Sequence, residues 1–359
     1  LSVVDDNYAG DSVSQEFRLT AAAGETVDYQ LGLFYYEQTT ERGDDRPFVI
    51  IGEDFLTIAR QQDLPLPPPF TIDQVAAVGD SLQANGKQVT ETLAAFGQAT
   101  WHLGNNWHVT GGLRWTDEEK ETELFSQTNS TASTAAIGRS FLDSVSTPID
   151  ATLQRSSDNI DWLFRVSMDI GDDSMVFASA ATGTKSGGFN SVNGAPENRA
   201  FDDEDTLSYE LGIKSTLLDS TLRINATAFH TAIDEFQFQQ QLETGLGTFT
   251  SNAAEVETSG LDFQIEALPL PNLTVTAGLL YMHKYETTDG PDKGLALPFT
   301  AEFSGNLATT LVFPLGDGGI YWRTDYSYMD DHSTNVASAA DLQGKDFDDR
   351  NLLNMKLGW

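Results

Sequence analysis

The chain has 359 residues, of which 40% are hydrophobic, and its formal net charge of -34 corresponds to a pI near 4.1. This acidity argues against nucleic acid as a partner, because phosphate backbones are bound by basic surfaces. The absence of cysteine excludes a disulfide framework, and the absence of any run of about 18 apolar residues excludes a membrane-spanning helix.

Polar and apolar residues alternate along most of the chain, as in a strand with one apolar and one polar face. In residues 207–214 every odd position is apolar and every even position is polar or Gly. In chain order, this pattern predicts strands at 11–22, 26–38, 91–102, 106–118, 159–170, 174–184, 205–217, 221–235, 255–267, 272–285, 299–313, 319–330 and 350–359.

The predicted strands are roughly nine to fourteen residues long, whereas strands of soluble proteins have about five or six. A tilted strand needs about 9–11 residues to cross the hydrocarbon of a bilayer. Length and alternation together predict an all-β protein, a transmembrane antiparallel β-barrel.

The predicted connections alternate between short and long. Short turns fall at 23–25, 104–106, 171–173, 218–220, 269–271 and 316–318. Longer connections lie at about 39–90, 120–158, 185–204, 236–254, 286–298 and 331–349. This sorting is typical of an outer-membrane barrel, with turns on the periplasmic side and loops outside.

Several aromatic residues fall near the ends of predicted strands, where their rings would lie at the headgroup level of a bilayer. The alternative is the aromatic core of a soluble β-protein. The residues are Trp101, Trp107, Trp115, Trp322, Tyr321, Tyr35 and Tyr36.

The predicted loops are acidic, and they either capture a cationic or metal-bearing ligand, bridge divalent ions to lipopolysaccharide phosphates, or form a hydrated surface. The acidic residues are Glu41, Asp44, Asp45, Asp117, Glu118, Glu119, Asp202, Asp203, Glu204, Asp205, Asp330, Asp331, Asp346, Asp348 and Asp349. Five cations should point into the barrel, where they either guide an anionic ligand or pair with carboxylates. They are Arg114, Arg165, Lys214, Arg223 and Arg323.

The sequence predicts no catalytic residue, no metal site and no cofactor, and it assigns no ligand-binding residue. Residues 183–186 (GTKS) lack the glycine spacing of a phosphate loop, and the G-x-S-x-G elbow has no match. The five histidines, at 102, 108, 230, 283 and 332, show no metal-ligand spacing. His102 and His108 nevertheless flank one tight turn and could approach each other.

Five segments resemble strands of the TonB-dependent receptor family in the family's own order. They are SQEFRLT (14–20) with DYQLGLFYY (28–36), GGLRWTDEEK (111–120), FASAATGTKSGGFN (177–190), YELGIKS (209–215), and NAA (252–254) with SGLD (259–262). The departures are small, since Ala181 and Thr184 replace the usual Arg and Tyr, and Asp262 replaces the usual Glu.

The resemblance implies a barrel of about 22 strands closed around an N-terminal plug. Residues 1–359 would form a partial barrel domain, approximately strands 8–20, with no plug domain. The plug, the TonB box and the closing strands would lie outside this chain, and the fragment would be an open, curved sheet of about 13 strands.

The resemblance also implies a non-enzymatic receptor and transporter of the Gram-negative outer membrane. It would take up a scarce nutrient, such as a ferric siderophore or a similar metal chelate. Its partners would be outer-membrane lipid, lipopolysaccharide, the nutrient, and TonB through the missing N-terminal region. Alternatives are a passive porin or hydrophobic-compound channel, and a secreted soluble β-sandwich or β-helix that binds carbohydrate.

Overall fold

The computed structural model describes most of the chain. The described residues are 2–3, 8–43, 49–53, 56, 76–104, 106–130, 149–190, 199–241, 248–290, 293–333 and 346–359. Within these ranges, no helix is long and apolar enough to cross a membrane.

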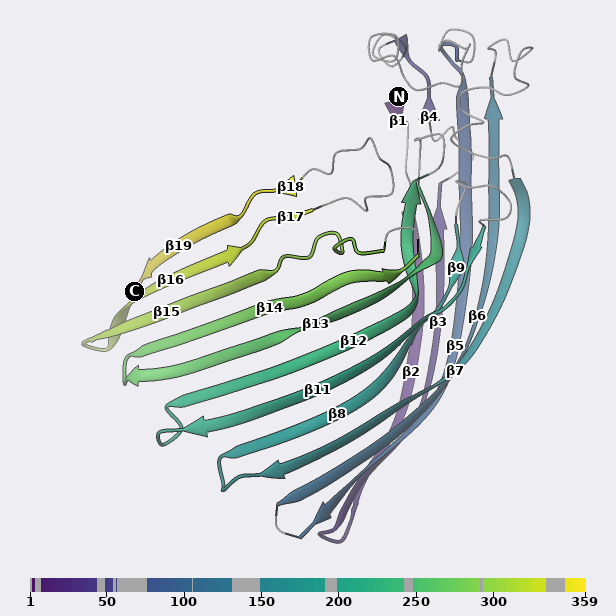
Figure 1. The fold of residues 1–359 in the computed structure, drawn as a ribbon. Coiled ribbons are helices and arrows are strands. Elements are labelled where there is room, and N and C mark those ends of the chain that lie inside the picture. Colours follow the sequence, from purple (N-terminus) through teal and green to yellow (C-terminus); the bar gives the residue numbers. More distant parts are fainter. Residues whose placement is uncertain are drawn as a thin grey trace.

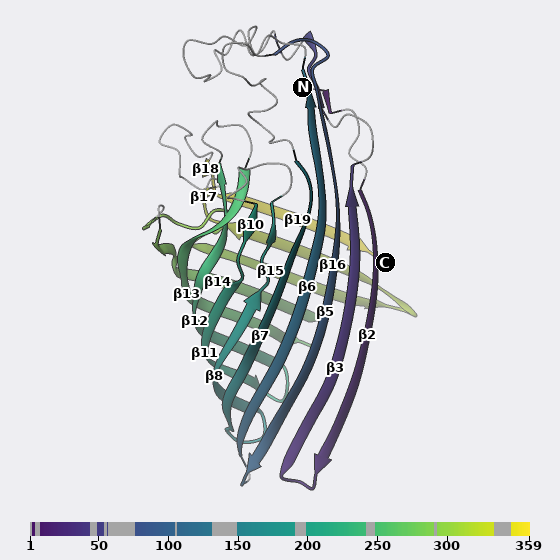
Figure 2. The same cartoon turned by 90° about the vertical axis from the view of Figure 1, so that its right-hand side faces the viewer.

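The described residues form one strongly curved antiparallel sheet that does not close on itself (Figures 1 and 2). Its long strands are β2 (Tyr8–Ala23), β3 (Val27–Arg42), β5 (Ser81–Leu103), β6 (Trp107–Asn129), β7 (Ile149–Asp169), β8 (Ser174–Lys185), β11 (Glu204–Leu217), β12 (Leu222–Gln241), β13 (Thr248–Leu270), β14 (Leu273–Asp289), β15 (Phe303–Leu315), β16 (Gly318–Met329) and β19 (Arg350–Gly358).

Short strands accompany these long ones at the loop end of the sheet. They are β1 (Ser2–Val3), β4 (Val49–Ile50), β9 (Gly188–Phe189), β10 (Ala200–Phe201), β17 (His332–Ser333) and β18 (Asp346–Phe347). β1 and β4 continue the main sheet, whereas β9 pairs with β10, and β17 with β18, in separate two-stranded sheets.

Each predicted strand is present, and the predicted short turns join the strands that they were expected to join. The prediction was wrong about the loop-side ends. β5 begins at Ser81, β6 runs to Asn129, and β7 begins at Ile149, so the connections 39–90 and 120–158 are partly strand. β12 and β13 likewise extend into the predicted connection 236–254.

The two faces of the sheet follow from its register. Residues directly opposite each other on paired antiparallel strands point to the same face. Trp115 therefore shares an apolar face with Ala95 and Ile160, and Arg114 shares a polar face with Phe96 and Asp161. The alternation persists from β3 to β19.

The width of the apolar face matches a bilayer. On β6 this face runs from Trp107 to Trp115, a span of nine residues. A tilted strand needs about 9–11 residues to cross the hydrocarbon of a bilayer. Beyond Trp115 the same face carries Glu119, Glu121 and Glu123, so the upper part of β6 extends past the lipid.

The register of the strands also corrects two of the aromatic residues that were predicted to lie at the headgroup level. Trp101, Trp107, Trp115, Trp322 and Tyr35 lie on the apolar face, as expected. Tyr36 lies on the polar face opposite Thr92, and Tyr321 lies on the polar face opposite Gly358. Both were wrongly predicted, because nearness to a strand end does not determine which face a ring occupies.

Buried side chains gather at the loop end, where chain segments fold over the tops of β5 and β6. Ile51, Leu82 and Leu124 are at most 5% exposed there. Asp80, which is 1% exposed, accepts hydrogen bonds from the Ala77 amide at 2.8 Å and the Ser130 hydroxyl at 2.7 Å. The described residues of the neighbouring connections therefore cover the loop-side ends of β5 and β6.

On the polar face, aromatic rings repeatedly cover the glycine directly opposite in the neighbouring strand. A Cβ added to Gly212 would lie 2.5 Å from the Phe177 ring, and one added to Gly32 would lie 2.1 Å from the Phe96 ring. The pairs Gly260–Phe229 and Gly358–Tyr321 repeat the arrangement. The absence of a side chain on each glycine makes room for the ring.

Gly212→Ala should destabilise the folded protein by about 1–3 kcal/mol, because its methyl group would overlap Phe177, which is 5% exposed. The matched control is Gly183→Ala, on the polar face of β8, where nothing lies within 4 Å of the added Cβ. Denaturant midpoints of the full-length protein in detergent would measure both. Equal midpoints for the two variants would contradict this account.

Candidate functional site

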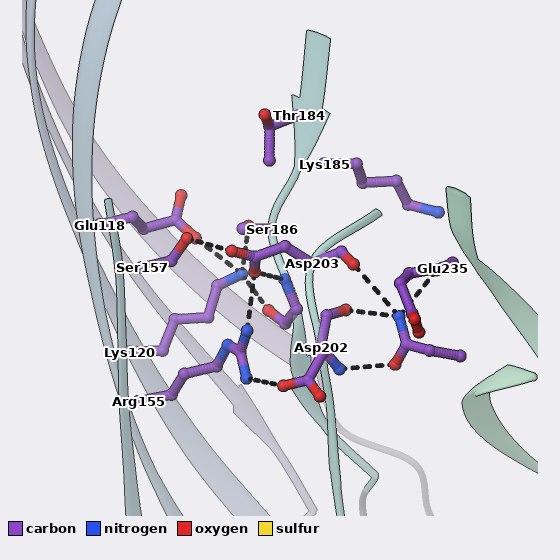
Figure 3. Close-up of polar contacts among 12 residues, drawn as sticks. Glu118, Lys120, Arg155, Ser157, Thr184, Lys185, Ser186, Asp202, Asp203 and Glu235 are labelled. Carbon is purple, nitrogen blue, oxygen red and sulfur yellow. Dashed lines mark hydrogen bonds and ion pairs between the residues drawn. The ribbon is translucent and has the colours of Figure 1, made fainter. Parts of the chain in front are cut away.

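The connection between β8 and β11 folds inward over the polar face of the sheet (Figure 3). Its described residues lie between Lys185 and Glu204 and include the β9–β10 hairpin. On one side the connection is anchored to β6 and β7, and on the other to β12 and β13. We call this set of contacts the loop latch.

Lys120 of β6 supplies the first anchor. Its ammonium group donates hydrogen bonds to the Ser186 hydroxyl at 2.6 Å and to the Gly187 carbonyl at 2.7 Å. The same group lies 2.8 Å from the Glu118 carboxylate. This cation therefore binds a backbone oxygen of the connection while a carboxylate of its own strand neutralises it.

Arg155 of β7 supplies the second anchor, and it lies directly opposite Lys120 in the sheet. Its guanidinium donates to Asp202 and Asp203, each at 2.8 Å. Asp203 also accepts hydrogen bonds from the Gly187 amide at 2.7 Å and from the Ser157 hydroxyl. The carboxylates of the connection thus neutralise a cation of the wall.

These contacts lower the pKa values of two carboxyl groups, those of Asp203 and Glu118. Burial alone would raise the pKa of Asp203, but hydrogen bonds from Ser157, Gly187 and Arg155 outweigh it, so this pKa lies below its ordinary value. Glu118 follows the same rule. Burial raises its pKa, and the hydrogen bonds involving Lys120 and Ser186 lower it by more.

The opposite side of the connection is held by amide side chains. Asn252 of β13 donates to the carbonyls of Asp202 at 2.9 Å and Glu235 at 2.8 Å, and its own oxygen accepts from the Asp202 amide at 2.6 Å. The Gln237 side-chain amide of β12 donates to the carbonyls of Ser186 at 3.0 Å and Asp202 at 3.1 Å, and the Gln237 backbone amide donates to the Glu204 carboxylate at 2.8 Å. A register shift in β12, with Glu235 at a φ of 53°, makes this approach possible.

The SGGFN segment (186–190) forms the joint at which the connection turns over the sheet. A Cβ on Gly187 would lie 2.2 Å from the Phe201 carbonyl oxygen and 2.8 Å from Arg155 Cζ. The Asn190 amide donates to the Thr250 carbonyl at 2.8 Å and its oxygen accepts from the Thr250 amide at 2.7 Å. Only glycine allows the backbone to approach Arg155 this closely.

A cavity of about 210 Å³ lies beside the latch, at the outer ends of β2 to β6. Two aromatic side chains line it, Tyr8 from β2 and Phe189 from the connection. Leu82 and Leu124 contribute apolar surface, and Glu41, Arg42 and Lys87 contribute charges of both signs. An aromatic or partly apolar ligand that also carries polar groups fits this lining.

The five cations predicted to point inward all lie on the polar face. Three contact carboxylates of the barrel wall: Arg165 lies 3.6 Å from Glu210, Arg223 lies 3.0 Å from Glu266, and Arg323 lies 2.5 Å from Asp325. The other two, Arg114 and Lys214, lie over aromatic rings. Of the two roles considered for these cations, Arg165, Arg223 and Arg323 therefore show pairing with carboxylates.

The sequence did not single out Lys120 or Arg155. Arg155 lay in a segment that was predicted to be a loop. The placement of Arg155 and Ser157, two residues apart, on the same face of a strand was therefore not recognised from the sequence. Among the predicted acidic loop residues, Asp202, Asp203 and Glu204 join the latch, and so does Glu118, which lies in strand β6 rather than in a loop. Asp44 and Asp45 lie outside the described residues. In the described part of the chain, no group of three or more His, Asp or Glu side chains is arranged to hold a metal ion.

An apolar band of bilayer width, short turns at one end and an inward-folded connection at the other define the wall of an outer-membrane β-barrel. Residues 3–359 match the family model described as TonB dependent receptor-like, beta-barrel. The chain belongs to that family, whose members are receptors of the Gram-negative outer membrane.

Two Yersinia proteins called pesticin receptor are similar to the chain. The protein of Yersinia enterocolitica is 27% identical over 184 residues, and that of Yersinia pestis is 26% identical over 187 residues. Each match covers 51% of this chain and 24% of the relative. The matched half of the chain therefore spans about a quarter of the length of these relatives.

Solved structures share the fold at low sequence identity. The ferric yersiniabactin uptake receptor FyuA from Yersinia pestis superposes with a TM-score of 0.74 at 18% identity, over 99% of this chain and 47% of that one. The siderophore receptor PiuA from Acinetobacter baumannii gives 0.68 at 18% identity, over 97% and 49%. The chain spans about half of each structure.

Arg155→Gln should release the connection from the wall, because it removes the charge that holds Asp202 and Asp203. Each charged hydrogen bond contributes about 1.5–3 kcal/mol, so amide exchange around Gly187 should accelerate by tenfold or more. Arg223→Gln is the control, since it breaks a polar-face ion pair away from the latch. Hydrogen exchange of the full-length protein in detergent measures both, and equal exchange would contradict the anchoring role.

The latch should open in acid. Since the pKa values of Asp203 and Glu118 are lowered by folding, their contribution is complete above the ordinary carboxyl range near pH 4. It is lost as the pH falls through the lowered values. Protection from exchange, taken relative to the intrinsic rate at each pH, should therefore fall in 186–190 and 199–203 below about pH 4 while the sheet stays protected. In Asp203→Asn this pH-dependent loss of protection should be smaller, and an identical pH profile in the variant would contradict the role of the Asp203 carboxyl.

Proposed function

We propose that this chain is the wall of an energised outer-membrane receptor that takes up a scarce nutrient, a ferric siderophore or a similar metal chelate. The observation that carries the proposal is the inward-folded connection beside a cavity that is lined by aromatic, apolar and charged side chains. Membership of the family and the names of the similar siderophore receptors support the choice of cargo.

The loop latch suits ligand capture. Its two sides are held by different chemistry, ion pairs on β6 and β7 and amide hydrogen bonds on β12 and β13. The connection thereby places Phe189 against the cavity with its backbone already ordered. A pre-ordered aromatic wall reduces the entropy lost when a ligand binds.

We propose further that residues 1–359 supply approximately strands 8–20 of a barrel of about 22 strands. The open sheet and its coverage of about half of the solved structures support this assignment. The plug and the TonB box would then be contributed from outside residues 1–359, and TonB would act on them. The reaction is binding coupled to a gated conformational change, with no bond chemistry.

Growth under iron limitation tests the proposal. A strain lacking the gene should fail to grow on at least one ferric chelate from a panel of catecholates, hydroxamates, carboxylates and phenolates, and the gene should restore growth. Deleting the gene for TonB should abolish the same growth.

Each outcome separates the alternatives. Uptake that continues without TonB would identify a passive channel. A deletion strain that grows on every ferric chelate but fails on cobalamin or a saccharide would keep the receptor and overturn the iron cargo.

A further inference from the structure

Two histidines contact each other at the short-turn end of the polar face. His102 of β5 and His108 of β6 are directly opposite in the hairpin, with their Nδ1 atoms 2.7 Å apart and ring planes at 79°. The Nε2 atom of His102 lies 2.8 Å from Asp28 of β3, and that of His108 lies 2.8 Å from Asp169 of β7. The chain of four groups crosses four adjacent strands.

The outer contacts determine the tautomers. A carboxylate accepts hydrogen bonds, so each Nε2 carries a proton and donates it to its aspartate. In a neutral ring this leaves a lone pair on Nδ1. Two neutral rings would then direct lone pairs at each other across 2.7 Å, which is repulsive unless a proton or a metal ion lies between them.

We propose that His102 and His108 form a binding site for one divalent late first-row metal ion, such as Zn²⁺ or Cu²⁺, on the polar face at the short-turn end. Imidazole nitrogens suit these ions. An imidazole ligand usually donates its other ring N–H to a carboxylate, which fixes the ring and raises its basicity. Asp28 and Asp169 occupy that position on both rings.

The geometry requires little adjustment. Two nitrogens bound tetrahedrally at about 2.0–2.1 Å from zinc are about 3.3 Å apart, so the Nδ1 atoms need to separate by roughly 0.6 Å. The backbone is fixed on both sides, since the His102 amide donates to the Thr26 carbonyl at 2.8 Å and the Asp169 amide donates to the Asn106 carbonyl at 2.8 Å. Both imidazoles are about a quarter exposed, so water completes the coordination.

This site is separate from the proposed cargo site. It lies at the opposite end of the strands from the loop latch, and its nitrogen ligands differ from the oxygen ligands that hard cations prefer. A bound ion would join the two strands of the β5–β6 hairpin, and the aspartates would tie that hairpin to β3 and β7.

The test uses the full-length protein in detergent, without an affinity tag and stripped of metal. Titration with Zn²⁺ should show one equivalent bound at this site, and Cu²⁺ should give an electron paramagnetic resonance spectrum with nitrogen ligands. His102→Ala and His108→Ala should each weaken binding at least tenfold. Asp28→Asn should weaken it by about 10- to 100-fold while leaving both imidazoles in place.

The matched control is His230→Ala, because His230 lies on the apolar face opposite Tyr209 and away from the turn. Its zinc affinity should equal that of the wild type. The proposal is overturned if the wild type binds no zinc, in which case only a shared proton lies between the rings. Unchanged binding in the His102→Ala/His108→Ala double variant, with the circular dichroism of the folded barrel, would overturn it equally.

Discussion

The structure depends on one constraint, that a backbone crossing hydrocarbon must satisfy its hydrogen bonds within the protein. An antiparallel ladder meets this requirement, and away from the register shifts in β12, β13 and β14 it makes side chains alternate between two faces. The apolar face then contacts lipid and the polar face is free for ion pairs, cation–aromatic contacts and glycine–aromatic pairs. The loop latch and the histidine pair both lie on that polar face because the ladder places them there.

Much of this arrangement could be predicted from alternation. The thirteen long strands were found because each carries its period of two through the lipid-facing part. The loop-side ends were missed because Glu119, Glu121 and Glu123 are polar on the face that is apolar lower down, so the amphipathic signal disappears while the strand continues. Because neighbouring residues of a strand point to opposite faces, placing Tyr35 on the apolar face would have placed Tyr36 correctly on the polar face.

The candidate site could not be predicted in the same way. Lys120 and Arg155 belong to different strands, and they meet Gly187 and Asp203 through a connection whose path no periodicity describes. The SGGFN segment lies at the site, but the reason for its glycines is a close backbone approach that only the three-dimensional structure reveals.

The histidine pair was nearly predictable, since a tight hairpin places His102 and His108 directly opposite each other. Their aspartates come from the outer strands β3 and β7.

The hairpin within the connection also makes the latch a single unit. The Asn190 backbone amide donates to the Arg199 carbonyl at 2.7 Å, and Phe189 pairs with Ala200, so two segments far apart along the loop are joined directly. The contacts with β6 and β7 come from both of these segments, through Gly187 on one side and Asp202 and Asp203 on the other. Loss of one anchor therefore strains the other through the hairpin, and the two should be released together rather than one at a time.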